Sequence, residues 1–165
     1  MEENRLLLLQ LARELVWWLI AAVATTVVIL PIFNKVNYQY WEVNAVIVFT
    51  AILYFLYVIF YRQSLFLRPK WLRFVLFVFN LNFFVFVIRQ SQFFISVYDS
   101  FTINDLGTLK SAMTFGQMER LYHYFLFETT LGVVTCLAMT AALNARMVHA
   151  YWQTAKTRLN GGETS

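Results

Sequence analysis

The amino-acid sequence predicts an all-α integral membrane protein: a four-helix bundle preceded by a short N-terminal interfacial helix. Of its 165 residues, 60% are hydrophobic and only 13% are charged, whereas a soluble domain has about 45–50% apolar and about 25% charged residues. Four apolar runs are each long enough to cross a bilayer as a helix. These runs are continuous, unlike the alternating strands of an outer-membrane barrel. The chain has only five glycines and two prolines, which also favours helices over turn-rich strands.

The first span is expected over Leu15–Phe33, behind a short amphipathic segment. Residues 1–13 begin with acidic side chains and so lack the basic start of a secretory signal. Leucines at positions 6–9 and 11 lie between Arg5 and Arg13. This pattern is typical of a helix that lies in the membrane interface and then turns into the first span. Pro31 lies in the last turn of the span, where it can end or kink the helix.

The second and third spans carry polar side chains at informative spacings. In the second span, Val43–Tyr61, the residues Thr50, Tyr54, Tyr57 and Tyr61 recur every three or four positions. They therefore share one helix face, and their hydroxyls predict that this face points into the bundle.

The third span, Trp71–Ile88, contains Asn80 and Asn82 near its middle. Two residues apart on a helix is about 200°, so these amides face nearly opposite ways. Either this helix is sandwiched between two neighbours, or one of the amides faces another protomer or another protein.

The fourth span is expected over Tyr124–Arg146 and contains one carboxylate, Glu128. Small side chains follow it at steps of four, namely Gly132, Cys136 and Thr140. Small residues on one helix face allow another helix to come close in a bilayer. We therefore expect these three residues to form a helix-packing seam.

Residues 1–152 are predicted to form a single membrane domain, with residues 89–120 as its one sizeable extramembrane loop. Thr102 and Asp105 stand three apart in that loop, as at the start of a capped helix. The polar residues 153–165 are expected to be a flexible tail.

The distribution of Lys and Arg predicts the orientation. The N-terminus, the connection between the second and third spans, and the C-terminal end carry nine cations, while the opposite side carries four. Since short cytoplasmic segments are enriched in Lys and Arg, both termini are expected in the cytoplasm. The net charge of +4 has the same explanation and does not indicate nucleic-acid binding.

Counting residues back from the predicted outer ends of the spans places polar groups of all four helices at similar depths. A candidate intramembrane cluster is therefore predicted around one carboxylate; its members are Glu128, Asn80, Asn82, Thr25, Thr26 and Thr50. A buried carboxylate is costly and marks a functional-site candidate. Three interpretations of Glu128 remain open: a group near the interface that sets helix depth, structural polar contacts, or an ion or substrate pathway.

The sequence contains no residue pattern that indicates a cofactor, a metal site or an enzymatic reaction. His123 and His149 are the only histidines and lie about 39 Å apart along one helix, so they cannot share one haem or metal. The single cysteine, Cys136, excludes a CxxC pair. Walker, G-x-S-x-G and H-E-x-x-H motifs are absent from the sequence.

Two segments carry a family resemblance. LPIFNKVNYQYWEVNAVIVFT, residues 30–50, and YRQSLFLRPKWLR, residues 61–73, resemble uncharacterised four-helix inner-membrane proteins of Bacteroidetes-type bacteria. The resemblance extends over most of residues 25–148. It implies a location in the inner membrane and a four-span topology, and it implies no mechanism.

The most favoured function is therefore an accessory, assembly or structural subunit of a larger membrane complex. Its partners would be the lipid bilayer and either other membrane subunits or further copies of the chain. The alternative is a small oligomeric transporter or channel that uses Glu128 as its ionisable site. An enzyme is the weakest of the three.

Overall fold

Four long helices make up this computed structural model, which describes residues 2–33, 41–100 and 114–161. They are α1 (Glu2–Phe33), α2 (Trp41–Ile59), α3 (Lys70–Ser100) and α4 (Phe115–Gly161), with a short 3-10 helix, η1 (Tyr61–Gln63), after α2. The described residues contain no strand. All four long helices are apolar enough to cross a membrane. The predicted fold class, an all-α four-helix bundle of a multi-pass membrane protein, is confirmed.

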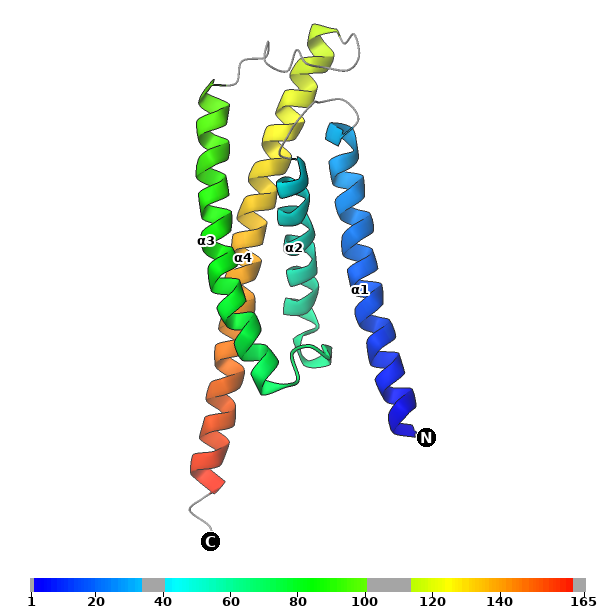
Figure 1. The fold of residues 1–165 in the computed structure, drawn as a ribbon, viewed down its shortest axis with the longest axis vertical. Coiled ribbons are helices and arrows are strands. Elements are labelled where there is room, and N and C mark those ends of the chain that lie inside the picture. The colour runs from blue at the N-terminus through cyan, green and yellow to red at the C-terminus, as the bar shows by residue number, and fades with distance from the viewer. Residues whose placement is uncertain (1, 34–40, 101–113, 162–165) are drawn as a thin grey trace.

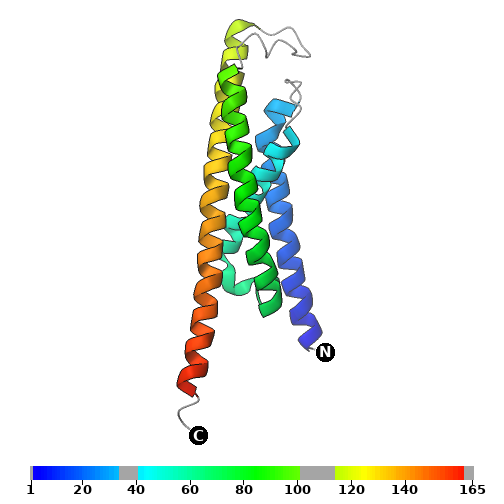
Figure 2. The same cartoon turned by 60° about the vertical axis from the view of Figure 1, so that its left-hand side comes forward.

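The helices run roughly along one common axis (Figures 1 and 2). The short helix α2 lies in the middle, packed against α4 on one side and α1 on the other, and α3 packs mainly on α4. Helix α1 begins and α4 ends at the same end of the bundle. We call this the inner end, and the end where α2 begins the outer end.

The helices are longer than the predicted spans. The N-terminal segment is not a separate interfacial helix, because α1 continues without interruption from Glu2 to Phe33. The expected loop 89–120 is also wrong in its bounds, since α3 extends to Ser100 and α4 begins at Phe115. Thr102 and Asp105, which suggested a helix start, lie outside the described residues.

The expected flexible tail is wrong for residues 153–161, which continue α4 to Gly161. Hydropathy identifies the part of a helix that lipid solvates, but a helix can extend into water with polar side chains. Counts of apolar residues therefore underestimate helix length at both ends of α4.

Two polar contacts between α2 and α4 bracket the lipid-facing part of α4. At the outer end, Asn44 of α2 donates to Glu128. At the inner end, Arg146 donates to the carbonyl oxygen of Val58. These two α4 positions are eighteen residues apart, which corresponds to about 27 Å, close to the hydrocarbon thickness of a bilayer. Both ends of α4, which has 47 residues, therefore project beyond α2.

Two clusters of buried side chains fill the interior. The cluster near the inner end includes Trp17 of α1, Tyr54 and Tyr57 of α2, and Leu143 and Met147 of α4. The second cluster joins α2, α3 and α4; its buried members are Ile47, Ala51, Val87, Phe94, Val133 and Cys136. The predicted inward face of α2 is thus confirmed for Tyr54 and Tyr57.

Hydrogen bonds fasten α1 to the connection between α2 and α3. Glu14 is only 3% exposed, and its Oε1 accepts a hydrogen bond of 2.6 Å from the Leu65 backbone N–H. Next to it, Arg13 donates to the side-chain and backbone oxygens of Gln63. The neighbouring Gln10 accepts from Arg68. This role of Glu14 could not be predicted from the sequence, because its partner is a backbone group about 50 residues away.

Candidate functional site: polar groups inside the bundle

Glu128 is buried at the outer end of the interface between α2 and α4. Its side chain is 5% exposed. Asn44 Nδ2 donates to Glu128 Oε2 over 2.5 Å, and the Thr129 hydroxyl lies 3.5 Å from the same oxygen. Asn44 is itself 1% exposed and belongs to the first turn of α2. The carboxyl group therefore lies inside the protein, about one turn below the outer end of α2.

The hydrogen bonding of this pair is incomplete. Glu128 Oε1 and Asn44 Oδ1 are both buried and have no hydrogen-bond partner among the described residues. Glu128 also lines a cavity of about 300 Å³ between α1, α2 and α4, whose other walls include Val28, Val48, Tyr124 and Gly132. The Tyr124 hydroxyl does not bond the carboxyl group, because it donates to the Val28 carbonyl. A buried acceptor without a donor is costly, so this pocket suits a proton or a small donor.

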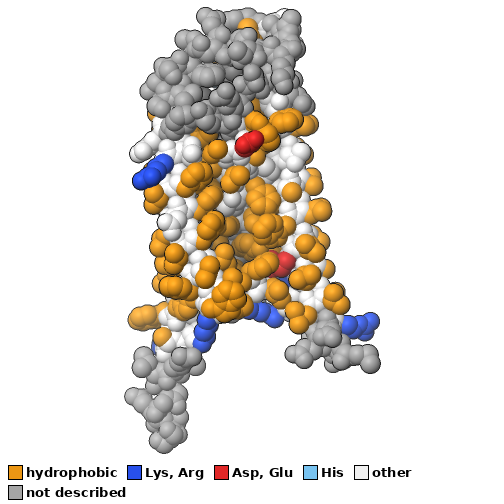
Figure 3. Space-filling view, in the orientation of Figure 1, with side chains coloured by type: hydrophobic (Ala, Val, Ile, Leu, Met, Phe, Trp, Pro, Cys, Tyr) orange, Lys and Arg blue, Asp and Glu red, His pale blue; other side chains and the backbone are white. Residues whose placement is uncertain are grey.

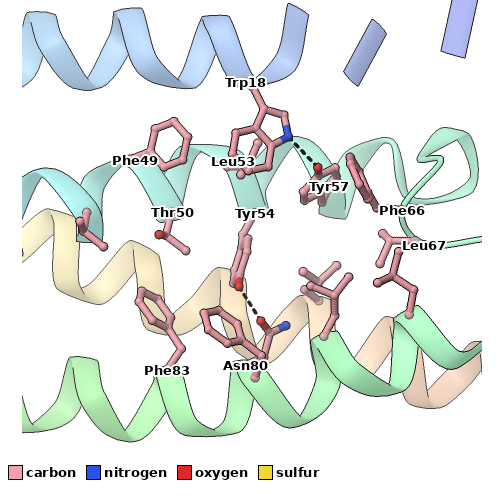
Figure 4. Close-up of a pocket in the computed structure, with 15 residues that line it drawn as sticks. Trp18, Phe49, Thr50, Leu53, Tyr54, Tyr57, Phe66, Leu67, Asn80 and Phe83 are labelled. Carbon is pink, nitrogen blue, oxygen red and sulfur yellow. Dashed lines mark hydrogen bonds between the residues drawn. The ribbon is translucent and has the colours of Figure 1, made fainter. Parts of the chain in front are cut away.

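A second set of hydrogen-bonded polar side chains lies nearer to the inner end of the bundle. The Tyr54 hydroxyl donates to Asn80 Oδ1 over 2.5 Å (Figure 4). The other end of the same amide, Asn80 Nδ2, donates to Asn144 Oδ1 over 3.1 Å. This chain of hydrogen bonds joins α2, α3 and α4. Asn80 is fully buried, and its hydrogen bonds to α2 and α4 hold its side chain in place.

The expectation that Asn80 or Asn82, together with the threonines, holds Glu128 is wrong, because neither amide bonds the carboxyl group. Asn80 bonds Asn144, which lies sixteen residues, or about 24 Å, along α4 from Glu128. The depth count failed because it started from the predicted outer ends of the spans, and α3 and α4 both extend well beyond those ends. The carboxyl group and the Asn80 amide are therefore two separate polar sites.

The predicted threonine members of the cluster do not form hydrogen bonds with Glu128. Thr25 and Thr26 donate to carbonyls of their own helix, those of Ala21 and Ala22. Thr50 is half-buried and lines the same cavity as Asn80.

Asn82 lies on the exposed side of α3, and its amide donates to the Val78 carbonyl one turn earlier. The predicted opposition of Asn80 and Asn82 is thus present in the structure. Asn44, the partner of Glu128, lies outside the predicted cluster, although an amide at the start of the second apolar run is visible in the sequence.

The predicted seam residues of α4 lie on the side of the helix that packs against its neighbours. Cys136 is fully buried and Thr140 is 1% exposed; the Thr140 hydroxyl donates to the Cys136 carbonyl. At Gly132, a Cβ atom would lie 3.2 Å from Val48 Cγ2. This side of α4 therefore approaches α2 closely at a position where the smallest residue is present.

A lateral groove of about 390 Å³ separates α2 from α3. In Figure 4, Phe49 and Tyr54 of α2 lie on one side and Phe83 and Asn80 of α3 on the other. Trp18 of α1 closes its edge and donates to the Tyr57 hydroxyl. The lining is almost wholly apolar, so hydrocarbon, either lipid or another helix, suits this groove.

The described residues contain no group of three or more His, Cys, Asp or Glu side chains that could hold a metal ion. A comparison with protein-family models, curated proteins and solved structures gives no match to this chain.

Proposed function

We propose that this membrane protein is an accessory, assembly or structural subunit of a larger membrane complex. One observation carries the proposal: Asn82, an amide in the middle of a membrane-length helix, is on the side of α3 that no other described helix covers. Its one described hydrogen bond stays within α3. Polar side chains within a bilayer favour helix association, because lipid offers them no partner.

The surroundings of Asn82 support a partner helix. Val75, Val78 and Val85 are exposed on α3, and together with Asn82 they are spaced three, four and three residues apart. Alternation of three and four is the repeat of a left-handed helix pair, in which a single Asn specifies register. Only 11% of the membrane segment of α3 is buried, compared with 39% for α2. Helix α3 therefore has room for a further helix along its outer side.

The proposed location is a bacterial inner membrane with both termini in the cytoplasm. An even number of spans puts the two termini on one side, in agreement with α1 beginning where α4 ends. The nine-to-four distribution of cations supports the cytoplasm for that side. The resemblance to Bacteroidetes-type inner-membrane proteins supports the same location.

The experiment is photo-crosslinking in native membranes. A photoreactive residue at Val78 should form one dominant adduct with a partner protein, and Asn82→Leu should remove most of it. The matched control is the same photoreactive residue at Val27 of α1, which is 65% exposed and should react with lipid only. Equal adducts at Val78 with and without Asn82, or no protein adduct at Val78, would contradict the proposal.

The alternative function is a small oligomeric transporter or channel. It is favoured by the buried Glu128, whose Oε1 has no described partner and whose side chain lines a cavity. A carboxyl group that exchanges a proton between a buried and a hydrated state could couple proton movement to transport. In this alternative the cavity between α1, α2 and α4 is part of the pathway.

A further inference from the structure

A polar cavity lies at the inner end of the bundle, apart from the groups described above. It has a volume of about 610 Å³ and lies between η1, the end of α2 and residues 146–153 of α4. Its polar lining includes Arg62, Gln63, Arg146 and His149. Ile59, Phe60 and Ala150 form its apolar lining. Among the described residues that line the cavity, none is acidic.

Two guanidinium groups bring positive charge to this cavity. Arg146 is held in place because it donates to the Val58 carbonyl at the end of α2. A guanidinium has five N–H donors, so others remain for a ligand. Arg62 is exposed and has no hydrogen bond or ion pair with another described residue. The cavity therefore has one fixed and one adjustable arginine, the arrangement that a phosphate oxygen can bridge.

A neutral phenol completes this polar wall. Burial raises the pKa of Tyr61 above its ordinary value, and the nearby Arg73 and Arg146 guanidinium groups oppose that rise. Tyr61 is therefore uncharged at physiological pH and brings no negative charge that would neutralise the arginines.

The cavity lies at the boundary between the apolar surface and water. In Figure 3, Lys and Arg side chains gather at the lower margin of the hydrophobic surface, which is the inner end. Ile59, on the apolar side of the cavity, is 51% exposed and continues into the lipid-facing surface of α2. A ligand that fits both sides has an anionic head and a hydrocarbon tail. Basic pockets between membrane helices bind such lipid headgroups.

We propose that this cavity binds the phosphate headgroup of an anionic phospholipid, with Arg62 and Arg146 on the phosphate. The acyl chains lie along Ile59 and the adjoining apolar surface. This site is independent of the partner helix proposed for α3, because it lies on different helices and at the end of the bundle.

The experiment is lipid titration of the delipidated, detergent-solubilised chain, followed by native mass spectrometry. Dioleoylphosphatidylglycerol should bind in a one-to-one adduct and dioleoylphosphatidylcholine much more weakly. Arg62→Gln should raise the dissociation constant for phosphatidylglycerol about fivefold, the amount expected for one basic side chain near an anionic headgroup. Arg146→Gln should have an effect at least as large.

Lys156→Gln is the matched control, since Lys156 is an exposed cation of α4 outside the cavity lining. It should leave the dissociation constant unchanged. Arg62→Gln removes no hydrogen bond to a described residue, so its effect does not depend on the fold. Equal losses in Lys156→Gln and Arg62→Gln, or equal binding of the two lipids, would overturn the proposal. Displacement of the lipid by millimolar inorganic phosphate would identify a free-phosphate site and overturn it as well.

Discussion

At the scale of single residues, a few buried polar side chains form hydrogen bonds between particular helices. Glu128 joins α4 to α2 through Asn44, and Asn80 joins α3 to α2 and α4 through Tyr54 and Asn144. Hydrogen bonds between helices in a membrane contribute about 0.6 kcal/mol on average. Their loss costs more when a partner is left buried and unpaired.

Substitutions of Glu128 distinguish a structural role of its carboxyl group from a role in transport. Glu128→Gln keeps an acceptor for Asn44, so the free energy of unfolding in a detergent titration should change by less than about 1 kcal/mol. Glu128→Leu removes that acceptor and should cost about 1–3 kcal/mol. A Leu variant as stable as the Gln variant would contradict the role of the Asn44 contact. Should Glu128→Gln abolish a pH-dependent flux in liposomes, the transporter alternative would be supported.

The two asparagines of α3 should respond in opposite ways to the same substitution. Asn80→Leu leaves the Tyr54 hydroxyl and Asn144 Oδ1 without a partner, and should lower the free energy of unfolding by about 1–3 kcal/mol. Asn82→Leu removes only a bond to its own helix and should change the stability of the isolated chain by less than about 0.5 kcal/mol. Equal destabilisation by both would contradict the assignment of their faces.

Sequence reasoning identified residue types and faces better than it identified partners. The 200° between Asn80 and Asn82 follows from helix geometry alone, and the structure has one amide inside and one outside. The partner of Glu128 could not be found from depth, because depth depends on where each helix crosses the membrane boundary. Asn44 carried a usable signal, since it is an amide at the outer end of an apolar run.

At the scale of the elements, the helices differ in how firmly they are integrated. Helix α2 is short and lies between α1 and α4, whereas only 11% of the membrane segment of α3 is buried. The apolar runs predicted that four helices exist, but they could not predict the lengths of α3 and α4. Polar extensions of a helix depend on local propensity and tertiary contacts rather than on hydropathy.

The approach of α4 to α2 should be sensitive to size at Gly132. A Cβ there would lie 3.2 Å from Val48 Cγ2, so Gly132→Ala requires a shift of a few tenths of an ångström and Gly132→Leu a larger one. We expect Gly132→Leu to cost about 1–3 kcal/mol in detergent unfolding, and Val48→Ala to restore part of it. Gly116→Leu is the control, because no atom of the described residues lies within 4 Å of its Cβ position. Equal costs at the two glycines would contradict close packing at Gly132.

At the scale of the whole molecule, the central claim is that lipid solvates most of the outer surface of four helices that hold Glu128, Asn44 and Asn80 inside the bundle. Large apolar side chains are exposed on every one of these helices. A bilayer is the solvent in which this surface is stable. At the inner end, α1 contacts the connection after α2, and α4 contacts the last turn of α2, so the helices are joined where the cations gather.

The most direct measurement is the accessibility of single cysteines in intact cells and inverted membrane vesicles. The background is Cys136→Ala, which removes the only native thiol. Cysteines at Arg62 and Lys156 should react with an impermeant maleimide from one side of the membrane, and a cysteine at Thr114 from the other. A cysteine at Ala138, an exposed position near the middle of the segment between Glu128 and Arg146, should react only after detergent is added. Labelling of Thr114 and Lys156 from the same side, or of Ala138 in intact membranes, would contradict the four-span bundle.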